Sequence, residues 1–136
     1  MKRMAIILLL FALTACAAAD QSEEAQKIVQ QLHQDMINQD WQHAIGLYDK
    51  DFLAEHPPQL WQAKLSGLTK RFGKLTKVVP VFMQKDPRLR GDFYMYGFRL
   101  EFARGRVEET LTVFKGVRSD RMVISGHVFK HKGKIL

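Results

Sequence analysis

The sequence is poor in cysteine: its 136 residues include a single one, Cys16. One thiol forms no disulfide within the chain and supplies no cysteine-rich metal site. The main apolar run, residues 4–13, is too short for a membrane-spanning helix, which needs about 20 apolar residues. No glycine-rich nucleotide-binding motif is present. We therefore expect a fold held together by its hydrophobic core alone.

The composition is that of one ordinary globular domain, with 46% hydrophobic and 26% charged residues. The net charge of +7 is unevenly distributed along the chain. Residues 20–63 carry eight acidic and two basic residues, whereas residues 64–136 carry most of the lysine and arginine. A basic half either attracts an anionic partner or spreads its charges over solvated strands.

The first sixteen residues have the layout of a secretory signal: Lys2 and Arg3, an apolar run, then small residues. Within it, Leu13-Thr14-Ala15-Cys16 resembles the lipobox of bacterial lipoproteins. The resemblance implies cleavage before Cys16 and attachment of diacylglycerol and further acyl chains such as palmitate. Several acyl chains anchor a protein firmly, because each buried CH₂ contributes about 0.8 kcal/mol. The alternative is an ordinary secreted protein in which Cys16 is incidental.

This reading divides the chain into a cleaved signal peptide (1–15), a lipidated cysteine with a short tether (16–21) and a single domain (22–136). Ala17 follows the cysteine where inner-membrane lipoproteins of many Gram-negative bacteria carry Asp. The resemblance thus implies a cell-envelope location, at the periplasmic face of the outer membrane if the source is Gram-negative.

Three segments of the front half have apolar residues at helical spacing. Asp20 and Glu23 form a capping box for the first segment, and Asp40 is placed to cap the second. Pro58 suits the start of the third segment and Gly73 its end. The apolar stripes comprise Ala25, Ile28, Val29, Leu32 and Met36; Trp41, Ala44, Ile45, Tyr48 and Phe52; and Leu60, Trp61, Leu65, Leu68 and Phe72. We expect three helices.

After Gly73 the pattern changes to the alternation of β-strands. We expect about four antiparallel strands, covering residues 75–83, 93–103, 107–115 and 121–130. Pro80 predicts an edge strand or a bulge, and residues 85–92 (KDPRLRGD) predict a loop.

Helices followed by antiparallel strands indicate an α+β protein in which the N-terminal helices pack on a curved sheet. The segments DWQHAIGLYDKDF, LWQAKLSGLTKRFGKL, VEETLTVF and RMVISGHVF resemble the cone-shaped fold of the nuclear transport factor 2-like superfamily. They are similar in particular to small bacterial lipoproteins of unknown function with that fold. The resemblance covers residues 22–130 and implies a pocket between the helices and the sheet.

Three residues are candidates for acid–base chemistry in such a pocket. Glu109 shares a strand face with Leu111 and Val113, and if that face is the inner one, desolvation would raise the pKa of Glu109. Tyr94 and Tyr96 share the apolar inner face of the preceding strand, where a hydroxyl could stabilise an oxyanion. The structural alternative is that both tyrosines only pack in the core. In the same alternative, Glu109 pairs with one of Arg99, Arg104 and Arg106.

The five histidines show no metal-ligand spacing. His127 and His131 lie about 13 Å apart on an extended strand, too far to share a metal ion. His33, His43 and His56 lie on separate segments. The sequence predicts neither a metal site nor a cofactor.

Lys85, Arg88 and Arg90 cluster beside Phe93 and Tyr94 and are candidates for anion binding. Lys130, Lys132 and Lys134 form a second basic set at the C-terminus. Anionic lipid or cell-wall polymer would suit these residues, and the envelope location argues against nucleic acid. The alternative is solvated loops.

Three functions remain open from the sequence. The first is a non-enzymatic envelope lipoprotein that binds an apolar ligand or an envelope protein. It could also form a homodimer through the outer sheet face at Phe93, Met95 and Gly97. The second is a small isomerase- or hydratase-like enzyme built on Glu109 with Tyr94 or Tyr96. The third is electrostatic docking on anionic lipid or polymer.

Overall fold

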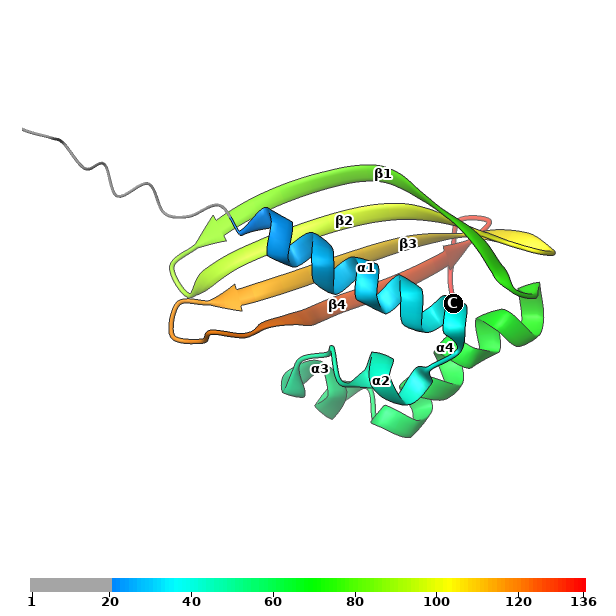
Figure 1. Ribbon diagram of the computed structural model, residues 1–136, viewed down its shortest axis with the longest axis horizontal. Coiled ribbons are helices and arrows are strands. Elements are labelled where there is room, and N and C mark those ends of the chain that lie inside the picture. Colours follow the sequence, from blue (N-terminus) through cyan, green and yellow to red (C-terminus); the bar gives the residue numbers. More distant parts are fainter. Residues whose placement is uncertain (1–20) are drawn as a thin grey trace, which may run out of the picture.

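The computed structural model describes residues 21–136, an α+β domain with N-terminal helices packed on an antiparallel sheet of five strands (Figure 1). The helices are α1 (Ser22–Asn38), α2 (Trp41–Ile45), α3 (Lys50–Glu55) and α4 (Pro58–Phe72). The strands are β1 (Leu75–Arg88), β2 (Gly91–Phe102), β3 (Gly105–Gly116), β4 (Met122–His131) and β5 (Lys134–Ile135). None of the described helices is long and apolar enough to cross a membrane.

The sheet is a meander in which each strand pairs with the next one along the chain, in the order β1-β2-β3-β4-β5. Strand β1 is therefore an edge. The other edge is partly covered, because the α2–α3 connection hydrogen-bonds to Ile124 of β4 through the backbone of Leu47 and Asp49. Helix α1 runs along one face of the sheet, where it contacts β1, β3 and β4 (Figure 1).

The core lies between this sheet face and the helices. The inner-face residues of β2 and β3 alternate as their sequence pattern predicts, and Tyr94, Leu100, Leu111 and Val113 are fully buried. From the helices, the buried stripe comprises Ala25, Val29, Leu32, Met36, Ala44, Phe52, Trp61, Leu65, Leu68 and Phe72. Burial of this apolar surface supplies the stability that disulfides do not.

Two of the expected helix signals are confirmed and one helix is divided. Asp40 caps α2 by accepting a hydrogen bond from the backbone N–H of His43, and Gly73 ends α4 with a φ of 85°. The segment expected as one helix from Trp41 to Phe52 is instead α2 and α3, because the chain between them pairs with β4. The described region thus has four helices, where three were expected.

Two further details of the helices differ from expectation. Leu60, placed on the apolar stripe of the third helix, is 69% exposed because it lies in the first turn, on the solvent side. The residue preceding α1 is Gln21, whose side chain makes no capping hydrogen bond. Asp20 of the expected capping box lies outside the described residues, as do the signal peptide and Cys16.

The prediction of a loop over residues 85–92 was wrong. Strands β1 and β2 pair continuously out to Arg88 and Gly91, and only Leu89 and Arg90 make the turn. A register shift between Pro80 and Phe82 is the bulge that Pro80 predicted. The sheet has five strands, where about four were expected, because the basic tail turns at Lys132 and Gly133 to form β5.

Candidate functional site

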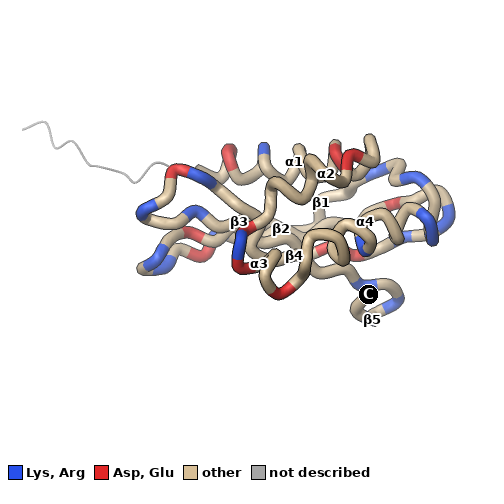
Figure 2. Tube along the Cα trace, turned by 90° about the horizontal axis from the view of Figure 1, so that it is seen from below, with Lys and Arg blue, Asp and Glu red and all other residues tan. Residues whose placement is uncertain are grey.

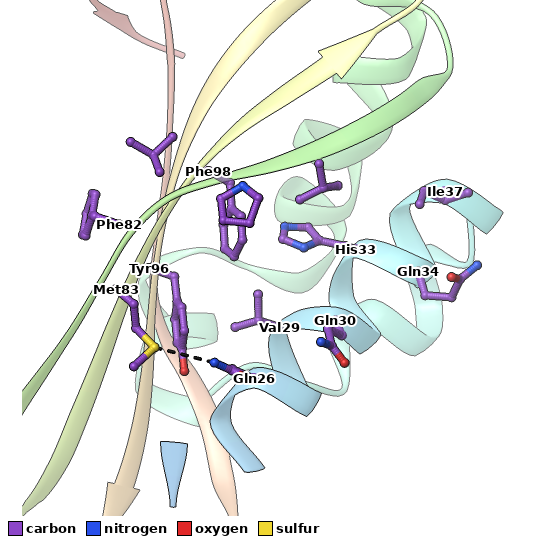
Figure 3. Close-up of a pocket in the computed structure, with 13 residues that line it drawn as sticks. Gln26, Val29, Gln30, His33, Gln34, Ile37, Phe82, Met83, Tyr96 and Phe98 are labelled. Atoms are coloured by element: carbon purple, nitrogen blue, oxygen red, sulfur yellow. Dashed lines mark hydrogen bonds between the residues drawn. The ribbon is translucent and has the colours of Figure 1, made fainter. Parts of the chain in front are cut away.

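An open groove of about 720 Å³ lies between α1 and the sheet edge formed by β1 and β2 (Figure 3). Its walls are mostly apolar and comprise Val29, Ile37, Val78, Pro80, Val81, Phe82, Met83, Tyr96 and Phe98. Gln26, Gln30 and Gln34 line the α1 side, and the Gln26 Nε2 approaches the Met83 Sδ at 3.7 Å across the mouth (Figure 3). The groove follows α1 from Gln26 to Ile37, about 16 Å at 1.5 Å per residue.

Among residues 21–136, no Asp, Glu, Lys or Arg lines this groove, and its one histidine, His33, belongs to a buried hydrogen-bonded relay. The His33 Nε2 lies 2.6 Å from the Glu109 Oε2, and the His127 Nε2 lies 2.6 Å from the Glu109 Oε1. The His127 Nδ1 is 2.7 Å from the Tyr48 hydroxyl. The relay therefore runs from the groove through Glu109 and His127 to Tyr48, joining α1, β3, β4 and the α2–α3 connection.

His127 reaches the inner face because β4 contains a bulge. Thr112 pairs with Gly126 and Val113 with Ile124, so Ser125 is the extra residue. Before the bulge, Met122 and Ile124 point inward. After it, the alternation shifts by one residue, and His127 and Phe129 point inward instead.

His33 reaches Glu109 because it lies one helical turn after Val29, at the margin of the buried α1 stripe. The edge of the Phe98 ring packs against its imidazole, with ring centroids 4.7 Å apart. Phe98 is directly opposite Glu109 in the β2–β3 ladder. This packing fixes the imidazole between the groove and the carboxylate.

The relay lowers the pKa of Glu109, which corrects the expectation that burial would raise it. Burial has the largest single effect on this pKa, and it raises the pKa as expected. The attraction and hydrogen bonds of His33 and His127 together outweigh it, and they lower the pKa from 4.5 to about 2. Glu109 is therefore ionised near neutral pH, and its partners are the two histidines, not Arg99, Arg104 or Arg106.

His127 and Tyr48, the two members of the relay farthest from the groove, are neutral. Burial lowers the pKa of His127, an effect that its hydrogen bond to Glu109 opposes, and burial raises the pKa of the Tyr48 phenol. A neutral His127 has one ring N–H, which on Nε2 donates to the Glu109 carboxylate. Its Nδ1 then accepts a hydrogen bond from the Tyr48 hydroxyl. Each polar side-chain atom of His127 and Tyr48 thus has a hydrogen-bond partner, with a donor facing an acceptor.

Glu109 itself cannot touch a ligand, because its side chain is 0% exposed, whereas the His33 side chain is 8% exposed at the groove. Acid–base chemistry or recognition of a polar ligand group would therefore act through His33, with Glu109 orienting the ring. The two imidazoles bind opposite oxygens of one carboxylate, so the cluster is a hydrogen-bonded relay, not a set of ligands converging on a metal.

The structure separates the two candidate tyrosines. Tyr96 lines the groove with His33, whereas Tyr94 is fully buried and lines no part of it. The Tyr94 hydroxyl has no hydrogen-bond partner among residues 21–136. Both carboxylate oxygens of Glu109 are hydrogen-bonded to histidines, and neither tyrosine is a hydrogen-bond partner of Glu109.

The anion-binding candidates lie on the β1–β2 hairpin, and two of them are paired with acidic residues. The Arg88 Nη2 lies 2.7 Å from the Asp86 carboxylate, and the Lys85 Nζ lies 3.8 Å from the Asp92 carboxylate. Only Arg90 of the three forms no ion pair within the described part of the chain. The hairpin is thus a weaker anion site than its sequence predicts.

Two further features singled out in the sequence, His43 and the outer face of β2, have structural roles. His43 bonds the buried carboxylate of Asp35, and its pKa is raised by that hydrogen bond. On the outer sheet face, the Phe82 ring lies over Gly97, so the chain itself covers part of the predicted dimer surface.

The relay was hidden from sequence analysis for one main reason. Its histidines are 94 positions apart along the chain and meet only through Glu109. The visible signal was Gly126 within a strand, since glycine in a strand often marks a bulge.

Comparison of the chain with protein-family models, with curated proteins and with solved structures gives no match in any of the three.

Proposed function

We propose that this chain is a lipid-anchored protein of the bacterial cell envelope whose domain binds an elongated apolar ligand in the α1–β1 groove. The lipobox at Cys16 supports the anchor, and Ala17 supports the outer membrane if the cell is Gram-negative. The domain would be a member of the nuclear transport factor 2-like superfamily, a proposal supported by helices packed on an antiparallel meander.

The groove is the observation that carries the binding proposal. Its volume of about 720 Å³ falls within the range of small-molecule sites, roughly 300–1,000 Å³. Its walls expose Val81 and Met83 at 63% and 50%, a sizeable apolar surface for a small domain. The elongated shape and the polar rim of glutamines suit an acyl chain with a polar end near His33.

Binding of a fluorescent polyene fatty acid tests this proposal. We expect saturable binding to the full chain and a Kd at least about tenfold higher for Met83→Asp, because a carboxylate in an apolar site disfavours an acyl chain. Titration of the probe fluorescence gives the Kd. Leu60→Asp is the matched control, since Leu60 is also an exposed apolar residue but lies on α4 away from the groove.

Equal affinity of both variants would show that the fatty acid does not occupy the groove. Absence of saturable binding to the unaltered chain would reject an acyl ligand altogether.

A second candidate is a small acid–base enzyme, which the His33–Glu109 contact specifically favours. An ionised carboxylate bonded to an imidazole orients the ring and increases its basicity, the arrangement used for general bases. The groove would supply an apolar site for a carbonyl substrate, and His33 would remove a proton next to that carbonyl.

Solvent-deuterium exchange into an apolar β,γ-unsaturated ketone checks the second candidate. We expect exchange above the buffer rate with the full chain and a loss of about 100-fold or more in His33→Gln, because general bases contribute 10²–10⁴-fold. NMR follows the exchange. Tyr94→Phe is the control and should keep the activity, since Tyr94 does not line the groove. An unaltered rate in His33→Gln would rule out this role.

A further inference from the structure

A second hollow, of about 510 Å³, lies near the C-terminus, where β2 and β4 end and β3 begins. We name it the cationic hollow, because its lining includes Arg99, Arg104, Arg106, Lys130 and Lys132 with Glu108 as its one carboxylate. These residues come from three strands and two turns, so only the folded chain brings them together. Figure 2 shows lysine and arginine gathered at this end, where β5 and the C-terminus lie.

Four of the five cations have no acidic partner. Arg99 pairs with Glu101 at 3.3 Å, whereas Arg104, Arg106, Lys130 and Lys132 form no ion pair within residues 21–136. This distinguishes the hollow from the β1–β2 hairpin, whose Arg88 and Lys85 are both paired. Unpaired cations close together repel one another and attract an anion that neutralises several of them.

The backbone holds these cations in fixed relative positions. Arg99 on β2 is opposite Glu108 on β3, and Glu108 is opposite Lys130 on β4. Arg99 and Lys130 therefore lie on either side of Glu108 in one row across the sheet. The His131 Nδ1 is bonded to the Arg106 backbone oxygen at 3.0 Å, which ties the end of β4 to the start of β3. Lys132 and Gly133 have φ values of 49° and 76°, as in a tight two-residue hairpin turn.

We propose that the cationic hollow is a binding site for a multivalent phosphate-bearing anion. Arginine presents its N–H groups in a planar fork that fits two phosphate oxygens, and lysine adds a point charge. Several cations around one hollow therefore suit several adjacent phosphate groups better than a single carboxylate. The site is separate from the groove and does not depend on what the groove binds.

Calorimetric titration of the full chain, in non-ionic detergent, with inorganic tripolyphosphate tests the site. We expect binding that weakens with salt and falls at least about tenfold in the double variant Arg106→Gln/Lys130→Gln. The double variant Arg90→Gln/Arg118→Gln removes the same charge from the hairpin tips at the other end and should change the affinity less than about twofold. Glu108→Gln should strengthen binding, because it removes the only carboxylate of the lining.

Three results would overturn the proposal: no binding of tripolyphosphate, an equal loss in the two double variants, or equal affinity for pentaglutamate. Vesicles containing phosphatidylglycerol form a separate arm that identifies the source of the phosphate. Vesicle binding lost in Arg106→Gln/Lys130→Gln points to lipid headgroups, whereas tripolyphosphate binding without vesicle binding points to a soluble or polymer-borne phosphate. Thermal unfolding of each variant checks that its fold is intact.

Discussion

Replacement of Glu109 by alanine is expected to lower the free energy of unfolding by about 3–5 kcal/mol. The variant leaves His33 and His127 without the carboxylate that each now bonds at 2.6 Å, in a site where the Glu109 side chain is 0% exposed. Glu109→Gln keeps the volume and part of the hydrogen bonding, and should cost less. Chemical denaturation of the three proteins measures the differences.

Glu108→Ala is the matched control, because Glu108 is the preceding residue on β3 but points to solvent. Its effect should stay within about 0.5 kcal/mol, as for most surface substitutions. A Glu109→Ala cost as small as that of the control would mean that the relay contributes nothing to stability.

The same carboxylate predicts the direction of the acid limb of the stability curve. The pKa of Glu109 is about 2 in the fold and near 4.5 when unfolded, so the unfolded chain takes up this proton first as the pH falls. Its stabilising contribution is complete above pH 4.5 and is lost as the pH falls towards 2. His127 acts in the same direction from pH 6.5 downward, because burial lowers its folded pKa. Glu109→Gln should flatten the lower part of this limb in denaturation at a series of pH values.

Replacement of Cys16 by serine is expected to abolish stable membrane association and incorporation of labelled fatty acid. Serine has no thiol to accept diacylglycerol, so the acyl chains are not attached. Each acyl methylene lost from the bilayer removes about 0.8 kcal/mol of anchoring, so loss of two or three chains is decisive. Fractionation of cells that express each form, with palmitate labelling, measures the effect.

Ala17→Asp provides the matched control, since it leaves the thiol in place. In a Gram-negative cell it should keep the lipid and shift the protein from the outer to the inner membrane. A Cys16→Ser protein that still fractionates with membranes, like the unaltered chain, would refute the lipobox interpretation.

The sequence was sufficient for the fold class because the two periodicities are strong and local. Alternation in Phe93–Phe102 correctly predicted that Tyr94, Tyr96 and Leu100 face the core, and the same pattern placed Glu109 beside Leu111. The predicted ends of strands were wrong where pairing with a neighbouring strand outweighed the local sequence signals. Residues 85–88 carry a proline and charges that favour a loop, yet they extend β1 because β2 offers a complete ladder.

The sequence by itself determined the α+β class, the strand face that Glu109 shares with Leu111 and the candidate lipid anchor at Cys16, because each rests on neighbours within a few residues. Tertiary structure decided what Glu109 contacts. The bulge at Ser125 turns His127 inward, and the crossing of α1 over the sheet brings His33 to the other oxygen. These partners reverse the direction of the Glu109 pKa, since two imidazoles outweigh the effect of burial.

Tertiary structure likewise moves the stronger candidate for anion binding from the β1–β2 hairpin to the cationic hollow. Local sequence shows which charges are near one another along the chain, but pairing with Asp86 and Asp92 neutralises Arg88 and Lys85 on the hairpin. At the opposite end, Arg104, Arg106, Lys130 and Lys132 converge, and none of them forms an ion pair within residues 21–136. Charge density in space depends on which strands are neighbours, and that is a property of the folded sheet.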